Sequence, residues 1–189
     1  PVHLVGKRAE LVPLEVAHIP DLYTTGNNPE IWHHLPMTVN TLDDMSDVVY
    51  AFLEDQQKGR SLPFTIIDQE SNRVVGSTRF HNISHENWSI EIGKTWLSPT
   101  VWGTHLNTEC KYLLMRHCFE TLHTIRVQLK TDVRNIRSQR AIERIGGVRD
   151  GVLRNHWIQP DGYKRSSVYY SILLEEWPER KKMLENMIY

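Results

Sequence analysis

Residues 97–114, Leu-Ser-Pro-Thr-Val-Trp-Gly-Thr-His-Leu-Asn-Thr-Glu-Cys-Lys-Tyr-Leu-Leu, constrain the fold of this chain more than any other stretch. A β-rich run ends at Leu97, a loop with Pro and Gly follows, and a helical pattern begins near Asn107. This order places the free amides and partial positive charge of a helix N-terminus at the end of a strand. We therefore expect a phosphate or pyrophosphate to bind at this corner.

Length and composition set the class of protein. At 189 residues the chain is long enough to bury a core, and we expect one domain over residues 1–189. The formal net charge of -1 gives no reason to expect nucleic acid or membrane as a partner. Cys110 and Cys118 lie too far apart on one predicted helix to form a disulfide. Free thiols favour a reducing, cytoplasmic location.

Periodicity and turn residues predict the order of strands and helices. We expect strands at residues 11–14, 62–68, 73–82, 88–97, 125–133, 148–158 and 165–174. We expect helices at residues 16–25, 41–58, 106–122, 138–145 and 175–189, with Thr41 as an N-cap and a turn at residues 160–162.

The connections predict how these seven strands pair. Short links between residues 62 and 97 favour an antiparallel meander. The helix at 106–122 joins its flanking strands by a crossover, which is how parallel neighbours are connected. The expected fold is therefore α/β, with α+β character: a mostly antiparallel mixed sheet, helices on both faces and one parallel strand pair.

Two further segments border this corner. Gly93 interrupts the strand Glu-Ile-Gly-Lys-Thr-Trp-Leu, which indicates a bulge or a close backbone approach. A bend there would open a gap beside the parallel strand for an extended ligand rich in amides. Asn135 and Ser138 follow that parallel strand, where both side chains are also suited to cap the next helix. Likewise, Gly103 in the loop is compatible with ordinary turn chemistry.

Taken in order, these segments resemble the GNAT N-acetyltransferases, and most of all the branch that acetylates ribosomal-protein N-termini. The loop Pro99-Thr-Val-Trp-Gly-Thr-His-Leu-Asn-Thr-Glu-Cys matches the branch's Pro-x-x-Trp-Gly-x-Gly loop and helix start. The later motif Asn-x-x-Ser-x-Arg begins here at Asn135. Three positions depart from the family pattern: Thr100 replaces Gln or Arg, His105 replaces Gly or Ala, and Ile142 replaces a Tyr general acid.

The resemblance implies direct transfer of an acetyl group from acetyl-CoA to an amine. It implies a GNAT-like sheet with a splayed parallel pair at its centre. The residues expected to bind CoA are Trp96, Leu97, Trp102, Gly103, Thr104, His105, Leu106, Asn107, Thr108, Asn135, Arg137, Ser138 and Arg140. Exposed helix arginines are also often solvated surface, so Arg137 and Arg140 have that alternative.

The acceptor ammonium must lose a proton before it attacks the thioester. Glu91 is the first candidate for the general base, and the alternative is a strand Glu paired with Arg or Lys. His81 on the adjacent strand is the second candidate, because histidine titrates near neutral pH; the alternative is a packed histidine. Ser138 is expected to stabilise the leaving thiolate by a hydrogen bond.

The acceptor side is expected to include Trp32, His33, His34, Trp88 and Trp157, although packing is an alternative role for these aromatic residues. No set of Cys and His has the spacing of metal ligands, so we expect no metal.

Two other functions remain open at this stage: a non-catalytic acyl-CoA-binding regulator on the same fold, and an unrelated α/β binding module. The resemblance allows a homodimer without requiring one.

Overall fold

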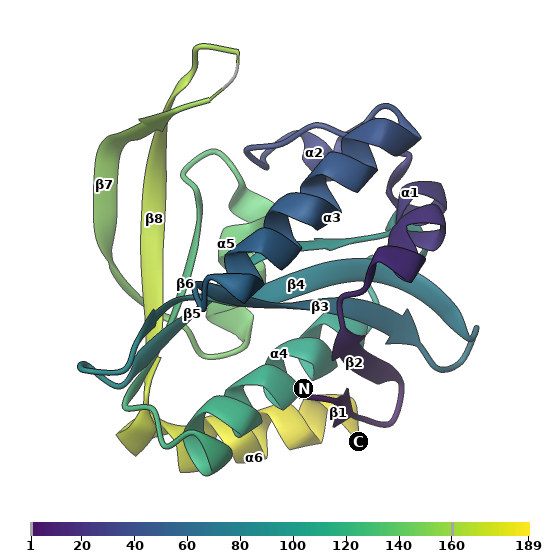
Figure 1. The fold of residues 1–189 in the computed structure, drawn as a ribbon. Helices are drawn as coiled ribbons and strands as arrows, with labels where there is room; N and C mark the ends of the chain where they lie inside the picture. Colours follow the sequence, from purple (N-terminus) through teal and green to yellow (C-terminus); the bar gives the residue numbers. More distant parts are fainter. Residues whose placement is uncertain (1, 160) are drawn as a thin grey trace.

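The computed structural model describes residues 2–159 and 161–189. Eight strands form one sheet in the order β1-β2-β3-β4-β5-β6-β8-β7 (Figure 1). The strands are β1 (Leu4–Val5), β2 (Ala9–Pro13), β3 (Ser61–Asp68), β4 (Arg73–Ser84), β5 (Ser89–Leu97), β6 (Arg126–Asp132), β7 (Val148–Ile158) and β8 (Lys164–Leu173). All neighbours pair antiparallel except β5 and β6, which confirms the predicted mixed sheet.

The sheet has one strand more than the seven expected. The additional strand, β1, holds only two residues, too few for a periodic pattern to show in the sequence. It pairs with β2 through Leu4↔Leu11 and Val5↔Glu10 at the edge of the sheet. The expected turn at residues 160–162 includes Pro160, which lies outside the described residues.

Helices cover both faces of the sheet, as expected. They are α1 (Ile19–Gly26), α2 (Pro29–Trp32), α3 (Leu42–Gln57), α4 (Leu106–Arg116), α5 (Ile136–Arg144) and α6 (Trp177–Ile188). Figure 1 shows α4 and α6 on one face and α1 and α3 on the other. Two groups of buried apolar side chains fill these layers, one beneath α4 and α6 and one beneath α1 and α3.

The helix boundaries follow from identifiable caps. At α3, Thr41 Oγ1 accepts from Asp44 N at 3.1 Å and the Asp44 carboxylate accepts from Thr41 N at 2.9 Å, which confirms the predicted N-cap. The helix α5 begins at Ile136, two residues earlier than expected, because Asn135 Oδ1 caps it by accepting from Ser138 N at 3.0 Å.

The central helix is shorter than predicted. It is α-helical only to Arg116, and His117–Thr121 form a π-helical turn in which Leu122 N donates to His117 O at 3.0 Å. This wider turn ends the helix before β6. Cys110 and Cys118 are both buried free thiols, as expected.

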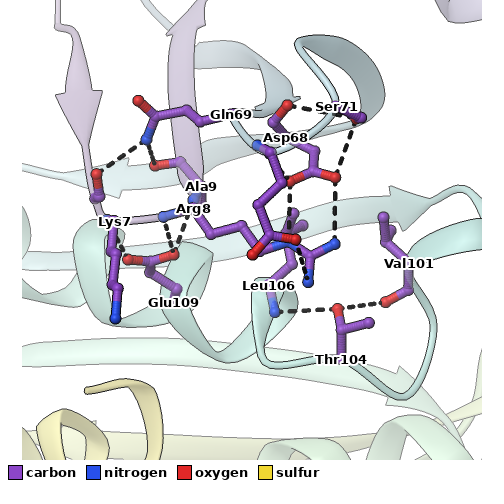
Figure 2. Close-up of polar contacts among 12 residues, drawn as sticks. Lys7, Arg8, Ala9, Asp68, Gln69, Ser71, Val101, Thr104, Leu106 and Glu109 are labelled. Carbon is purple, nitrogen blue, oxygen red and sulfur yellow. Dashed lines mark hydrogen bonds and ion pairs between the residues drawn. The ribbon is translucent and has the colours of Figure 1, made fainter.

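Figure 2 shows how the start of α4 is fixed to the edge strands. The buried Glu109 carboxylate accepts hydrogen bonds from the backbone amides of Lys7, Arg8 and Ala9, the last two at 3.0 and 2.8 Å. Arg8 in turn pairs with Asp68 at 2.9 Å. A charged acceptor shared by three amides holds the helix N-terminus in a defined place relative to β2.

The parallel pair splays apart, as the resemblance implies. Paired residues of β5 and β6 extend only from Ser89↔Arg126 to Glu91↔Gln128, although both strands continue beyond them. On its other side β5 has a register shift against β4 next to Gly93. This bulge, in which Lys94 has a φ of 51°, confirms the irregularity predicted at Gly93.

No helix in the described part of the chain has the length and apolarity to cross a membrane.

Candidate active site

A cavity of about 510 Å³ opens where β5 and β6 diverge. Its walls come from strands β4 to β8, from α4 with the loop before it, from α5, and from α2 with the segment after it. It brings together most of the residues predicted for the site: His81, Glu91, Trp96, Leu97, Trp102, Gly103, Thr104, Asn107, Thr108, Asn135, Arg137, Ser138 and Trp157, with His34 beside them. Segments that are far apart in sequence therefore share one space.

Some backbone amides of the loop before α4 have no hydrogen-bond partner, whereas others donate hydrogen bonds within the loop. Trp102 N donates to Pro99 O, and Thr104 N to Val101 O. Leu106 N donates to Thr104 Oγ1 at 3.3 Å (Figure 2). The amides without a hydrogen-bond partner among the described residues are those of Gly103, His105, Asn107 and Thr108. The anion-binding capacity predicted for this corner thus rests on four amides rather than on the whole loop.

Two side chains brace this loop against the sheet. Trp102 Nε1 donates to Leu97 O at 2.9 Å, so the carbonyl of Leu97, a residue expected to bind CoA, already has one partner. Arg137 Cζ lies 3.9 Å from the centroid of the Trp102 ring. This cation–π contact holds the Arg137 guanidinium at the cavity wall beside the free amides.

Glu91 is the most enclosed carboxylate of the cavity, with 1% of its surface exposed. Its Oε2 accepts from Asn82 Nδ2 and Gln128 Nε2, each at 2.8 Å. Its Oε1 lies 3.0 Å from Lys130 Nζ and 3.2 Å from His81 Nε2. The contact with His81 is not directed as a hydrogen bond, so its attraction depends on the charge of the imidazole.

This environment decides what Glu91 can do. Burial alone would raise the pKa of the carboxyl, but the contact and charge of His81, the charge of Lys130 and the hydrogen bond from Asn82 together lower it to about 2. A carboxylate with so low a pKa is a weak proton acceptor at neutral pH. The geometry therefore favours His81 as the base and Glu91 as the residue that orients it.

Gly93 lets His81 take this position. A Cβ atom at Gly93 would lie 2.3 Å from His81 Nε2, closer than any real contact. The glycine predicted from the strand pattern is thus required by a close approach of a side chain from the neighbouring strand.

Several predicted residues lie outside the main cavity. Leu106 is fully buried in the core, and Trp32 is buried with its Nε1 bonded to Gly26 O and its ring 5.1 Å from Trp96, so both are packing residues. Trp88 is 55% exposed in the β4–β5 turn. His33 borders a second pocket, which adjoins the main cavity and shares Trp102 and Arg137 with it.

His105 and Arg140 are exposed and do not line the cavity. The His105 imidazole therefore does not obstruct the amides of its own loop. Ile142, which stands where the family has a Tyr, is buried and contributes no acid.

Six of the seven lysines and arginines that line the cavity were not predicted, among them Lys94, Lys111, Lys130 and Arg165. Lys111 is buried on α4 with Nζ 2.6 Å from Thr95 Oγ1, and burial lowers its pKa to about 8. A lysine among the apolar residues of that helix was the only signal available in the sequence. Lys94, Lys130 and Arg165 come from separate strands, and only the sheet order brings them together.

Comparison with known proteins identifies the family. The family model of the acetyltransferase (GNAT) domain matches residues 8–148. The chain belongs to the GNAT acetyltransferase family. This GNAT protein is accordingly an acyltransferase, as the resemblance implied.

Proteins with similar sequences or structures have names that agree with this family assignment. The proposed ribosomal N-acetyltransferase YdaF of Bacillus subtilis strain 168 is 32% identical over 108 residues, which cover 57% of this chain and 58% of YdaF. The crystal structure of a proposed acetyltransferase from T. thermophilus is 37% identical, with a TM-score of 0.91 over 100% of this chain and 98% of that one. Mycobacterium smegmatis RimJ, solved with CoA-disulfide, shares the fold at 20% identity, with a TM-score of 0.85 over 98% of this chain and 94% of RimJ. Similarity to the ribosomal-protein branch is thereby confirmed.

No group of three or more His, Cys, Asp or Glu in residues 2–159 and 161–189 is placed to bind a metal ion.

Proposed function

We propose that this GNAT protein transfers the acetyl group of acetyl-CoA directly to a primary amine, either a peptide N-terminus or a small molecule. The observation that carries the proposal is the single cavity that holds both a set of free loop amides and the buried His81–Glu91 pair. The first suits the phosphates of CoA and the second suits an amine that must lose a proton.

The residues of the splay fit the shape and chemistry of CoA. The amides of Gly103, His105, Asn107 and Thr108 would hold the pyrophosphate, with Arg137 adding charge. Gly103 has a φ of 74°, and no atom lies within 4 Å of the place where a Cβ would stand, so its backbone is open to close approach. The edge of β5 beyond Glu91 offers backbone groups to the amides of pantetheine.

The α5 side of the cavity would hold the other edge of pantetheine. Asn135 Oδ1 is occupied by the helix cap, which leaves the Nδ2 group to donate to the ligand. Ser138 lines the cavity one turn further on, where its hydroxyl would donate to the leaving thiolate. Because a Ser hydroxyl is a weak acid, this contribution is a hydrogen bond rather than proton transfer. Holding both reactants in one cavity is the larger effect, about 7–11 kcal/mol of the barrier in favourable cases.

His81 would accept the proton of the acceptor ammonium, directly or through water. Glu91 would fix the imidazole and stabilise its positive charge after the transfer. The ion pair between Glu91 and Lys130 keeps the carboxylate ionised throughout. The wall formed by His34 and Trp157 is the proposed acceptor side. The likeness to YdaF supports a protein N-terminus as acceptor, and a small amine remains the alternative.

The test is to mix the protein with acetyl-CoA and a panel of primary amines, and to follow release of free thiol together with the mass of the acceptor. Acetylated acceptor should appear in step with thiol, and a peptide with a blocked N-terminus should give neither. If CoA binds but no amine is acetylated, the proposed acetyl transfer is wrong. If millimolar CoA fails to bind, the cofactor assignment is wrong as well.

A cytoplasmic location and a homodimer stay predictions from the sequence.

A further inference from the structure

Trp157 of β7 is surrounded by cations from three other strands. Lys94 Nζ of β5 and Lys130 Nζ of β6 each lie 5.7 Å from the centroid of its ring, and Arg165 Cζ of β8 lies 4.9 Å away. All four side chains line the main cavity. The aromatic face attracts each cation weakly, but it does not cancel the repulsion between three positive charges.

The carboxylates of the cavity do not balance these charges. Seven lysines and arginines line it, against Glu30 and Glu91 as the only acidic residues among the described lining residues. The oxygens of Glu91 are already engaged by Asn82, Gln128 and Lys130. The side chain of Lys94 forms no hydrogen bond or ion pair with any residue in the described ranges.

Arg165 is the second cation without an ion-pair partner among the described residues, although the charge of Asp132 acts on it from a greater distance. Only 5% of its surface is exposed, and its single side-chain hydrogen bond is from Nη1 to the His34 carbonyl oxygen at 3.4 Å. Its Nε is buried and has no partner among the described residues, although buried guanidinium N–H groups are normally satisfied. By contrast, Arg79 on β4 pairs with Asp55 at 3.1 Å.

Lys94 shows the electrostatic consequence. Burial, followed by the positive charges of Arg79, Lys130 and Arg165, lowers its pKa to about 8. The charged form is thus disfavoured, and an anionic ligand beside it would reverse that effect. The bulge at Gly93 holds the Lys94 backbone at a positive φ, so the position of this unpaired cation in the cavity is built into the strand.

We propose that Lys94 and Arg165 form an anion subsite for the acceptor, so that the amine acetylated by this protein carries a carboxylate or phosphate close to the reacting nitrogen. The inference rests on the proposed function, because it places the amine at His81 and Glu91. Lys94 follows Glu91 by three residues on β5, and its Nζ contacts the same Trp157 ring as Lys130, the ion-pair partner of Glu91. In a peptide this closeness places the anionic group on the second or third residue.

The phosphates of CoA are the competing explanation for these cations. They are expected at the loop amides and Arg137, which belong to the α4 and α5 walls, whereas Lys94 and Arg165 belong to β5 and β8. The two explanations differ in which ligand loses affinity when Lys94 or Arg165 is replaced.

The test uses short peptide amides with a free N-terminal Ser. The second or third residue is Asp or phosphoserine, with Asn or Ser as the uncharged partner of each. Binding is measured by calorimetry with CoA present, and kcat/KM is measured with acetyl-CoA. Lys94→Met and Arg165→Gln remove the proposed charges, and Lys94→Arg restores one. Lys164→Met, an exposed lysine next to Arg165 on β8, is the matched control.

We expect Asp or phosphoserine peptides to bind about 10- to 100-fold more tightly than their uncharged partners, as charge-assisted hydrogen bonds would give. Lys94→Met and Arg165→Gln should each remove most of this preference and leave CoA affinity unchanged, while Lys94→Arg and Lys164→Met keep the preference. A thermal melt of each variant establishes that it is folded. Comparison of the Asp peptide with the phosphoserine peptide shows whether the subsite prefers a carboxylate or a phosphate.

Equal binding of charged and uncharged peptides, or binding of neither, would overturn the anion subsite. So would variants that lose CoA affinity but keep the peptide preference. Tighter binding of the charged peptides without acetylation of any peptide would support the anion subsite and contradict acetyl transfer. Failure of the subsite and failure of the proposed function are therefore distinguishable.

Discussion

Glu91 and His81 have different proposed roles: His81 accepts the proton, and Glu91 orients His81. The pKa of Glu91 is lowered to about 2, so a change of activity between about pH 5 and 8 would not come from this carboxylate. We expect His81→Gln to lower kcat/KM by about 100-fold or more, as loss of a general base would, and Glu91→Gln to lower it less. A larger loss for Glu91→Gln than for His81→Gln would restore Glu91 as the base.

The same carboxylate should affect stability in acid. Its folded pKa of about 2 is below the ordinary value of 4.5, so its stabilising effect is complete above about pH 4.5 and is lost as the pH falls toward 2. The difference corresponds to about 3 kcal/mol at most. Urea unfolding of wild type and Glu91→Gln at several pH values should show a smaller acid-dependent loss in the variant. Parallel curves would contradict the ion-pair description of Glu91.

Gly93 offers a residue-scale test of the base. A methyl group there would meet the His81 ring, while Gly151 on β7 has no atom within 4 Å of the same group. We expect Gly93→Ala to reduce kcat by about 10-fold or more with a stability loss of about 1–3 kcal/mol, and Gly151→Ala to leave kcat unchanged. Full activity of Gly93→Ala would show that the His81 position is not required.

At the scale of elements, the loop before α4 carries the proposed phosphate site. Gly103 and Gly59 have similar positive φ values, 74° and 69°, and neither has an atom near a Cβ position. Gly103→Ala and Gly59→Ala should therefore cost a similar amount of stability, about 1 kcal/mol. Only Gly103→Ala should weaken CoA binding, measured by calorimetry. Equal CoA affinities for both variants would contradict the proposal that this loop binds the cofactor.

Sequence patterns over a few residues predicted most of the helices and strands. They did not predict features that depend on tertiary contacts. The strand–loop–helix corner, the bulge at Gly93 and the caps at Thr41 and Asn135 are short-range features, and each is present. The roles of aromatic residues are not local: Trp32 is a core residue because α2 places it on Trp96. Likewise, the number of free amides depends on bonds such as that of Leu106 N to Thr104, which no pattern in the sequence reveals.

At the scale of the whole molecule, sheet order creates the site. Lys94, Lys130 and Arg165 are far apart in sequence, and the order β5-β6-β8-β7 places them around Trp157. Figure 1 shows β7 and β8 as a long hairpin beside the splayed strands. The sequence predicted each of these strands but not β8 between β6 and β7. The cationic character of the proposed acceptor side could therefore not be predicted from the sequence.

A ligand that bridges the splay should stabilise the entire chain. CoA would contact β5, α4 and α5 at once, and binding to the folded state alone adds about 2.7 kcal/mol at a concentration about 100-fold above Kd. For a chain of 189 residues this raises Tm by roughly 5–10 °C. Pantetheine, which lacks the pyrophosphate, should give a much smaller rise in a thermal melt. Equal rises would mean that the loop amides do not hold phosphate.

The central claim is that CoA binds between the diverging strands β5 and β6, with its phosphates on free amides of the loop before α4 and of the first turn of α4. A titration of the ¹⁵N-labelled protein with CoA tests it most directly, because each backbone amide is observed separately. The amide signals of Gly103, His105, Asn107 and Thr108 should shift together and saturate with one affinity, while that of Gly59 stays in place. Saturating CoA that leaves all four amide signals unshifted would contradict the account.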